Sequence, residues 1–502
     1  MALEINASFV QHVAYEENID KWNLIKAVLD GKEAIDNGQE TYLPKPSGRT
    51  SDEYENYQKR AVLYNATART LEGLLGAIFR KQPKIILPKE LEYLKEDTDG
   101  EGNDIIQFSK KATRSSISYG RHGLLVDFPV ASHIRNLAEE RAANLKARIH
   151  SYCPQSIVNW RVARVGGILK LTHVLLQESG LNVGNHPLEH NVFNRYRLLE
   201  LDSTGRYVIR IMEPKVVPKP NGNKGETLSV ITEVETLLPL LPNGERLDFI
   251  PFKFIGSVTN NTEIDKAPLY DLAHLNLAHY RNSADYEEAL YMLGQPTPWI
   301  TGLDDEFIEN NQGSLRIGSR TAWLLPEGSE VGLLESKSEK NLLQKGMELK
   351  EAEMIGLGAR LVQDNSVRGS ESTESVLFRR SGEANQMSCI ADNVSSAVRQ
   401  AIEWVALWMG VKGDVTFILN TDFFTTRLTH QEIEALVTAW QGGAISHNVV
   451  LDNLRKGEVI DPLVTNEEVM SDIENESPSL SMEGVGIGAI DVNTGSADST
   501  PD

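Results

Sequence analysis

Three residues near the middle of this 502-residue chain could do metal chemistry: His186, Glu189 and His190. They follow the order H-x-x-E-H, which on a helix would put both imidazoles on one face to bind zinc, with the glutamate as a base. Pro187 and the surrounding asparagines instead favour a loop. No companion motif supplies a third ligand, so we expect no bound metal and keep a metal-dependent hydrolase only as the weaker alternative.

Other catalytic signatures are missing from the sequence. It has no phosphate-binding G-x-x-x-x-G-K-S/T loop and no G-x-S-x-G hydrolase motif. Gly356 and Gly358 lack the third glycine of a dinucleotide-binding fingerprint, and Cys153 and Cys389 are too few for a disulfide framework or a four-cysteine zinc site. We therefore expect neither an enzyme nor a bound cofactor.

The charge of the chain is acidic and unevenly placed. Its 71 Asp and Glu outnumber 50 Lys and Arg, which gives a formal charge of −21, and no apolar run approaches the roughly 18 residues of a membrane helix. No basic residue follows Lys456, and the 46 residues 457–502 contain eleven acids, so they carry −11 of the total. Such a protein does not bind nucleic acid through bulk charge, because phosphate contacts need Lys and Arg. It could surround DNA without adhering to it, or the acids could simply keep it soluble.

Helical periodicity dominates the first hundred residues. We expect a helix near residues 16–29 that ends at Gly31. Thr50 and Glu53 form a capping box, and apolar residues then recur at spacings of three and four as far as Ile78, so we expect one helix of roughly 29 residues that ends before Pro83.

Residues 115–262 are typical of antiparallel β-structure with helices on either side, and the chain as a whole of an α+β protein. Helical periodicity appears only around residues 134–149. Gly166-Gly167 and residues 202–205 have the composition of hairpin turns. The expected strands are residues 123–128, 157–165, 168–177, 196–201, 207–212, 228–236 and 252–258.

Two helices around a small insert follow. The first begins at Pro268 and ends at Gly294, and its apolar face is interrupted by Asn276, His279 and Asn282. The insert, residues 295–336, is rich in Gly and Pro with short β-runs at 315–317 and 321–325. A capping box of Ser336 and Glu339 opens the second helix, which reaches about Val362.

The last third begins with a polar loop at residues 363–373 and a long helix that runs to Trp408 and is stopped by Gly410. A strand at 415–419 comes next. A third capping box, Thr429 and Glu432, opens two short helices that end near Trp440 and Lys456, and from Ser477 we expect disorder.

In this order of parts, roughly residues 50–475, the chain resembles the portal, or head–tail connector, proteins of tailed bacteriophages. Three stretches carry the likeness, although their motifs are compositional and less specific than an active-site signature. They are Tyr57–Gly76 with Phe79–Pro83, Pro268–Asp285 with Pro296 and Pro298, and Leu419–Phe423 with Leu428 and Gly457–Val459.

The resemblance implies a portal fold with a wing, a two-helix stem, a small α/β clip, a channel loop with a long helix, and a short helical crown. No long helical barrel follows the crown, in contrast to other family members. The implied boundaries are 1–262 for the wing, 263–294 and 337–362 for the stem helices, 295–336 for the clip, 363–412 for the channel loop and long helix, 413–474 for the crown, and 475–502 for an acidic, disordered tail.

The resemblance also implies a function. Portal proteins form homo-oligomeric rings, usually of twelve subunits, at one capsid vertex of the virion, and are assembled in the host cytoplasm. Double-stranded DNA passes through the ring during packaging and ejection. The implied partners are further copies of the chain, the major capsid protein, the terminase large subunit, and head-completion or tail adaptor proteins, with no membrane and no enzymatic activity. Another capsid, baseplate or scaffold protein stays open as an alternative.

Two hypotheses about the channel follow from the resemblance. Arg368 is the one basic residue of the polar loop, and it would face DNA phosphates. Acidic side chains of the stem would line the bore and keep DNA from adhering. The alternative for the acidic set is an ordinary solvated helix face. The acidic candidates are Glu287, Glu288, Glu348, Glu351 and Glu353.

Overall fold

The computed structural model describes two compact units, residues 1–423 and 424–502, which are treated separately here. No helix among the described residues is long and apolar enough to cross a membrane. The described residues are 4–6, 11–128, 146–183, 190–218, 227–294, 297–303, 305–310, 325–334, 340–358, 373–421, 423, 430–457, 459–460 and 464–476.

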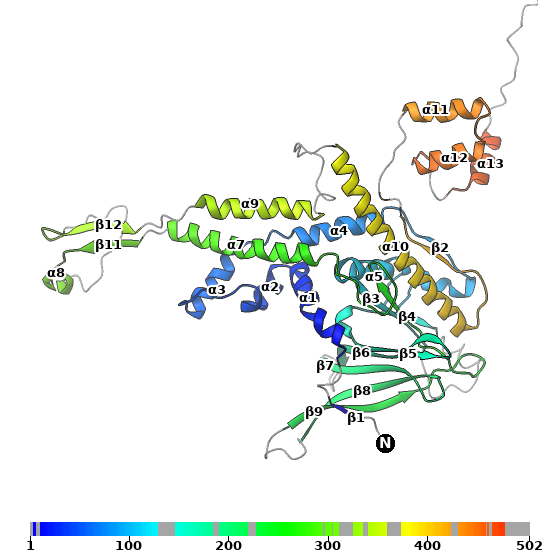
Figure 1. Ribbon diagram of the computed structural model, residues 1–502, viewed down its shortest axis with the longest axis horizontal. Helices are drawn as coiled ribbons and strands as arrows, with labels where there is room; N and C mark the ends of the chain where they lie inside the picture. The colour runs from blue at the N-terminus through cyan, green and yellow to red at the C-terminus, as the bar shows by residue number, and fades with distance from the viewer. Residues whose placement is uncertain are drawn as a thin grey trace, which may run out of the picture. The chain divides into compact units, whose positions relative to one another are not determined.

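The first unit mixes helices and antiparallel sheets, which confirms the α+β fold class (Figure 1). The helix expected at 16–29 is α1, and Gly31 ends it with a φ of 98°. The elements that precede the sheets are α1 (Val13–Asp30), α2 (Lys32–Asn37), η2 (Gln39–Thr41), α3 (Ser51–Arg60), α4 (Ala66–Ile78), β2 (Lys84–Ile86), η3 (Lys89–Lys95) and α5 (Ile105–Tyr119).

The single helix of roughly 29 residues expected after Thr50 is wrong, because the chain breaks between α3 and α4. The capping box of Thr50 and Glu53 is confirmed at the start of α3. At the break, the Asn65 side chain accepts a hydrogen bond from the Ala68 amide at 2.9 Å and donates one to the Val28 carbonyl at 2.7 Å. Buried apolar residues recur at spacings of three and four within each helix. The periodicity therefore looks continuous in the sequence and does not reveal the break.

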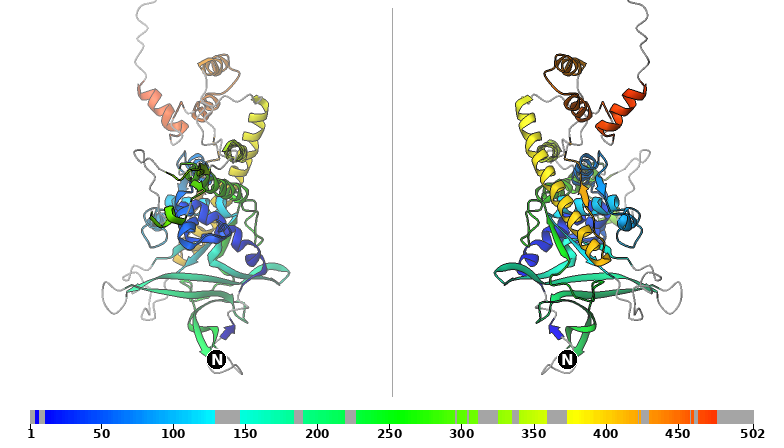
Figure 2. Two further views of the ribbon diagram at one scale, coloured as in Figure 1. Left: turned by 90° about the vertical axis from the view of Figure 1, so that its left-hand side faces the viewer. Right: turned by 90° about the vertical axis from the view of Figure 1, so that its right-hand side faces the viewer.

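A six-stranded antiparallel sheet has the order β1-β9-β8-β7-β6-β5, and a three-stranded sheet has the order β10-β3-β4. The helices lie to one side of the larger sheet (Figure 2). All seven expected strands are present, and Gly166-Gly167 forms a turn with positive φ at both residues. The strands are β1 (Glu4–Asn6), β5 (Ile157–Val165), β6 (Ile168–Val183), β7 (His190–Leu201), β8 (Tyr207–Pro218), β9 (Thr227–Leu237), β3 (Arg121–Asp127), β4 (Arg148–Tyr152) and β10 (Phe252–Gly256), with η4 (Pro154–Ser156) before β5.

The helix expected around 134–149 is wrong at its end, because residues 148 and 149 belong to β4. These residues pair with Asp127 and Val126 of β3, and strand pairing outweighs the helical periodicity there. The remainder of that segment, up to residue 145, lies outside the described residues.

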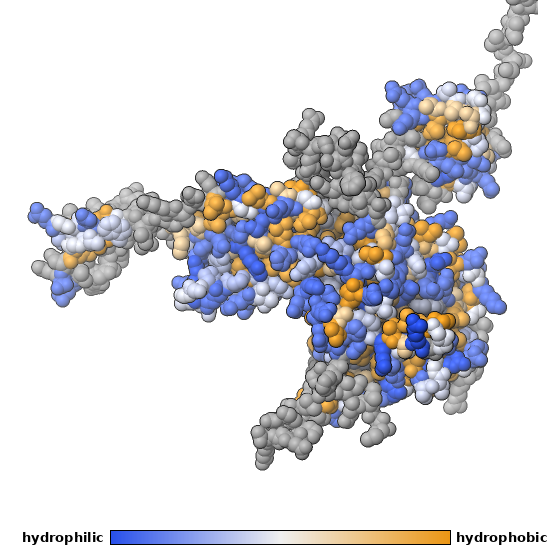
Figure 3. Space-filling view, viewed as in Figure 1, coloured by the Kyte–Doolittle hydropathy of each residue, from blue (hydrophilic) through white to orange (hydrophobic). Residues whose placement is uncertain are grey.

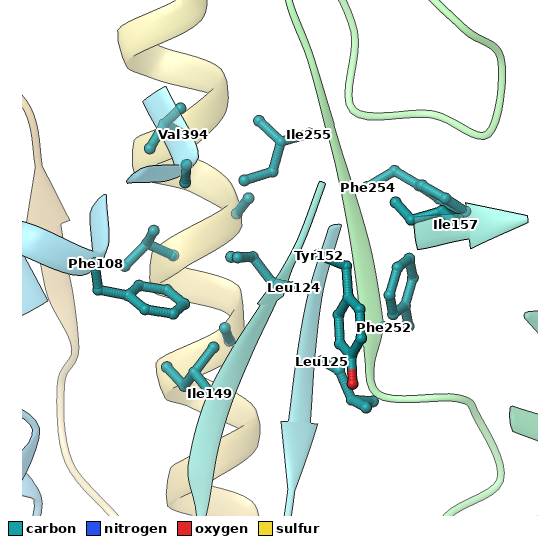
Figure 4. Packing of buried hydrophobic residues seen from close by; sticks show 14 of the residues in the cluster. Phe108, Leu124, Leu125, Ile149, Tyr152, Ile157, Phe252, Phe254, Ile255 and Val394 are labelled. Carbon is teal, nitrogen blue, oxygen red and sulfur yellow. The ribbon is translucent and has the colours of Figure 1, made fainter. Parts of the chain in front are cut away.

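The main core lies between the three-stranded sheet and the helices α5 and α10 (Thr373–Met409). Figure 4 shows Phe108, Leu124, Ile149, Ile255 and Val394 pointing into it from five different elements. The expected apolar stripe of α10, from Met387 to Trp408, is buried throughout, and Gly410 follows with a φ of 64°. Strand β13 (Thr416–Ile418) then pairs with β2.

Both helices expected around the insert are present (Figure 1), but the end expected near Val362 is wrong for the second one, because α9 ends at Gly356 and a turn follows in which Gly358 has a φ of 122°. The capping residues Ser336 and Glu339 and the short β-runs expected at 315–317 and 321–325 fall outside the described residues, except for residue 325. The elements are α7 (Tyr270–Gly294), β11 (Thr297–Thr301), α8 (Asp305–Asn310), β12 (Glu330–Leu334) and α9 (Lys340–Gly356).

The second unit contains α11 (His430–Gln441), α12 (His447–Lys456) and α13 (Asn466–Glu476). The first two confirm the expected pair of short helices, whereas α13 was not expected. Ser446 caps α12, and the rings of Trp440 and His447 stack with centroids 4.8 Å apart, which fixes the turn between α11 and α12. Thr429 and the segment after residue 476 lie outside the described residues.

Candidate functional site: the paired helices and their attachment

The helix α7 is fixed to the break between α3 and α4 by one amide side chain. Asn276 is fully buried, and its oxygen accepts hydrogen bonds from the Thr67 amide and hydroxyl at 3.1 and 3.0 Å. Its nitrogen donates to the Tyr64 carbonyl at 2.7 Å. A buried amide is tolerated when its donors and acceptors are paired, so the residue that interrupts the apolar face of α7 is a specific contact.

Two tyrosine–carboxylate pairs extend this attachment along α7. Tyr280 donates to Asp36 at 2.7 Å, and Tyr57 donates to Asp285 at 2.6 Å. Burial, together with the carboxylate partner, raises the pKa of both tyrosines well above the usual value, so both hydroxyls stay protonated donors at neutral pH. The Ser283 hydroxyl accepts a hydrogen bond from the Val62 amide at 3.0 Å and donates one to the Val62 carbonyl at 2.7 Å.

Glu288 is held inside the unit and is not a free surface carboxylate. It is 8% exposed, and its two carboxylate oxygens meet Arg49 at 2.7 Å and Arg60. The Arg60 guanidinium also lies over the Tyr291 ring, 4.3 Å from its centroid. The sequence analysis places Glu288 in the channel lining. In the single chain Glu288 instead belongs to an ion cluster that joins α7 to α3.

The second helix of the pair, α9, packs antiparallel against α7. His279 of α7 approaches Glu351 with its Nε2 atom 3.2 Å from a carboxylate oxygen, and three residues later Asn282 lies beside Gly346. A Cβ at Gly346 would lie 3.4 Å from the Asn282 side chain, an ordinary van der Waals distance, so the helices are in contact here but do not require glycine. Met354 of α9 is fully buried.

The acidic residues expected to line a channel do not share one surface. Glu348 and Glu351 are three residues apart and face the same side of α9, whereas Glu353 follows Glu351 by two residues and faces the opposite side. Glu348 and Glu353 are exposed, and Glu287 is half-buried on α7. Arg368 lies outside the described residues.

The outer side of α9 carries an exposed apolar row. Leu342 and Leu349 are 67% and 65% exposed, and their spacing of seven residues places them on one face, which Glu353 shares; Leu357, 51% exposed, directly follows the end of the helix. Hydrophobic residues are visible among hydrophilic ones along the paired helices (Figure 3). The main packing partner of α9 among the described elements is α7, so no described residue covers Leu342 and Leu349.

The insert at the end of the pair is built on a two-stranded ribbon. Strands β11 and β12 pair over five positions, and the Trp299 ring covers its partner Gly332, where a Cβ would come within 2.5 Å of the ring. Trp299 and Val331 remain exposed. An isolated two-stranded ribbon is only marginally stable, so the insert has apolar surface left for a further contact.

The H-x-x-E-H residues do not form a helical zinc site. His190 opens β7 and pairs with Val183 of β6, while His186 and Glu189 lie outside the described residues. Within the described parts of the chain, no group of three or more His, Cys, Asp or Glu is placed to hold a metal ion.

Sequence reasoning missed the partners of α7, namely Asp36, Arg49, Tyr57 and Arg60. Each contact that they make with α7 joins residues more than 220 positions apart, and no local pattern reveals it. The available signal was the set of polar residues within the apolar face of α7, since Asn276 and His279 both make buried contacts.

Comparison with known families and structures gives limited likeness. A family model described as a domain of unknown function (DUF4055) matches residues 268–409, from the start of the helix pair to the end of α10. No curated protein matches the chain.

Three solved structures are similar over 82% of this chain. The neck of a native GTA particle with C12 symmetry has 12% identity, 95% coverage of its chain and a TM-score of 0.39. The neck of an empty GTA particle with C6 symmetry has 12% identity, 96% coverage and a TM-score of 0.40. The virion of a native gene transfer agent (GTA) particle has 13% identity, 94% coverage and a TM-score of 0.36.

Proposed function

We propose that this chain is the subunit of a viral portal, a ring of copies through which double-stranded DNA enters and leaves a capsid. The main support is the helix pair, in which α7, of 25 residues and about 37 Å, is fixed to α1–α4 along its buried face. The pair connects this base to a small β-containing insert, and the long α10 follows. This order of parts is the one for which the sequence resembles portal proteins.

The exposed row on α9 supports a ring. A contiguous apolar surface on a soluble protein commonly marks a contact with another protein. In the proposed ring, Leu342, Leu349 and Leu357 pack against the helix pair of the neighbouring copy. The insert then lies at one end of the ring as the docking surface for the packaging terminase and later for adaptor proteins, while residues 1–262 contact the capsid.

The channel surface follows from the same arrangement. With the leucine row against a neighbour, Glu348, which is exposed on α9, is free to face the bore, whereas Glu351 is held against His279 of α7. Carboxylates there repel phosphates and let DNA slide, and a chain of net charge −21 fits that role. The proposal needs no catalytic residue and no cofactor.

Imaging of the purified full-length chain tests this proposal. We expect rings with an axial hole, whereas a shell, sheet or spike would favour another scaffold protein, and a 55.8 kDa monomer at all salt concentrations would refute the ring. Leu349→Asp should convert rings into smaller species, because it places a charge in the row. Leu240→Asp, at a leucine of similar exposure outside the pair, is the matched control and should leave rings intact.

A further inference from the structure

A groove of about 650 Å³ opens at one end of the six-stranded sheet, outside the helix pair. It lies between the β5–β6 ladder and the turn that joins β7 to β8. Its lining is mostly polar and includes three cations, three hydroxyls and two carboxylates. These side chains are Arg161, Lys170 and Arg206, then Thr172, Ser203 and Thr204, and finally Asp202 and Asp248.

The two carboxylates of the groove already have partners. Asp248 pairs with Lys170 at 3.2 Å. Asp202 pairs with Arg246 at 2.8 Å and also accepts hydrogen bonds from Thr204 and from the Arg206 amide. These bonds, above all the one from the Thr204 hydroxyl, hold the pKa of Asp202 below its usual range, so it stays ionised and occupied.

Arg161 is different because it is a cation with no opposite charge. Its side chain is exposed, and no carboxylate pairs with its guanidinium among the described residues. It lies in register with His173, whose pKa is lowered by burial, so His173 stays neutral and adds no competing charge. The Arg206 guanidinium donates to the Arg246 carbonyl at 2.8 Å, so neither arginine that lines the groove is in an ion pair among the described residues, although the chain has 71 acids and 50 bases.

An exposed apolar residue lies further along the same strand pair, next to the turn between β5 and β6. Ile168 starts β6 opposite Val165, on the face that Arg161 and Ala163 share by strand alternation, and it is 65% exposed. Arg164 lies on the same strand but pairs with Leu169, so it faces the opposite side of the sheet. The groove therefore combines a cationic anchor, hydroxyl groups and an apolar edge.

We propose that this groove binds an acidic peptide segment of a partner protein, with Arg161 as the anchor for a carboxylate. Peptides offer the mixture that the lining matches: carboxylates for the guanidinium, backbone groups for the hydroxyls, and an apolar side chain for Ile168. A nucleic acid fits less well, because its closely spaced phosphates would meet the carboxylates of Asp202 and Asp248, and Lys170 is already paired with Asp248. This site is independent of the proposed portal function.

Fluorescence anisotropy with the full-length chain tests the site. The probe is a short labelled peptide in which glutamate and leucine alternate, compared with the same peptide carrying glutamine for glutamate, at about 0.15 M salt. Arg161→Ala should weaken binding about tenfold, as expected for loss of a charge-assisted hydrogen bond. Arg164→Ala is the matched control and should leave affinity unchanged. Asp248→Asn should strengthen binding, because it frees Lys170.

Each other outcome overturns the proposal. Failure of the wild-type chain to bind the acidic peptide would do so, as would equal binding of the glutamine peptide or an equal loss with Arg164→Ala. Tighter binding of a DNA duplex that Arg161→Ala abolishes would assign the groove to nucleic acid. A change in sedimentation with Arg161→Ala would assign it to a second copy of the chain.

Discussion

Replacement of Glu288 by glutamine tests how α7 is attached to the rest of the first unit. The carboxylate lies between two guanidinium groups, those of Arg49 and Arg60, and its side chain retains 11% exposure. The amide of glutamine keeps the shape and one acceptor oxygen but removes the charge. Two cations then face each other in a partly buried site with no opposite charge.

The size of the effect follows from burial. Removal of one partner from a fully buried ion pair costs about 3–5 kcal/mol. The two arginines remain 23% and 25% exposed, so water compensates for part of the loss. We therefore expect about 2 kcal/mol for Glu288→Gln, and less than about 0.5 kcal/mol for Glu287→Gln, a neighbouring half-buried position without an ion pair.

Hydrogen exchange measures this loss locally, in the elements that the ion cluster joins. A loss of about 2 kcal/mol should speed exchange about thirtyfold in α3 and in the last turns of α7, with little change in α10. Equal exchange in the wild type and in Glu288→Gln, or the same acceleration in Glu287→Gln, would refute the view that this ion cluster holds α7.

Two further predictions concern buried polar groups. Burial lowers the pKa of His122 to about 3, and neither ring nitrogen has a hydrogen-bond partner among the described residues. Below about pH 6.5 His122 binds a proton in the unfolded chain but stays neutral in the folded chain, so the free energy of unfolding should fall by up to about 1.4 kcal/mol per pH unit as the pH drops. Urea midpoints at pH 7 and 5 should show this fall in the wild type and a smaller one in His122→Phe. Asn276→Ala should leave the Thr67 and Tyr64 backbone groups unpaired and cost about 2 kcal/mol, measurable as faster exchange at the start of α4, and unchanged exchange there would contradict the role of this amide.

Elements with strong local signals could be predicted from the sequence. The alternation of strands β5 to β9, the Thr50–Glu53 capping box and the glycine ends at Gly31 and Gly410 each depend on a few neighbouring residues. The buried stripe of α10 repeats so regularly that its helix is unambiguous. For such segments, local propensity and tertiary packing favour the same conformation.

Features set by distant partners could not be predicted. The break before Asn65 depends on the Val28 carbonyl and on Asn276, which lies 211 positions further along the chain. Glu288 has the composition of a solvated helix residue in the sequence, and its burial follows from two arginines contributed by the region around α3. The channel-lining set remains a prediction, because the proposed bore lies between copies of the chain.

The two helices of the pair differ in the contacts that they make within the chain. We therefore expect substitutions in α7 to affect folding and substitutions on the exposed face of α9 to affect the proposed assembly. Along α7, residues Asn276, Tyr280, Ser283 and Glu288 each make hydrogen bonds or ion pairs to elements near the N-terminus. Substitutions there should lower the stability of the isolated subunit before they affect anything else. By contrast, α9 meets α7 on one side and presents its leucine row on the other. Substitutions in that row should leave the subunit folded but unable to assemble. If Leu349→Asp unfolds the chain instead of giving a folded monomer, this division between the two helices is wrong.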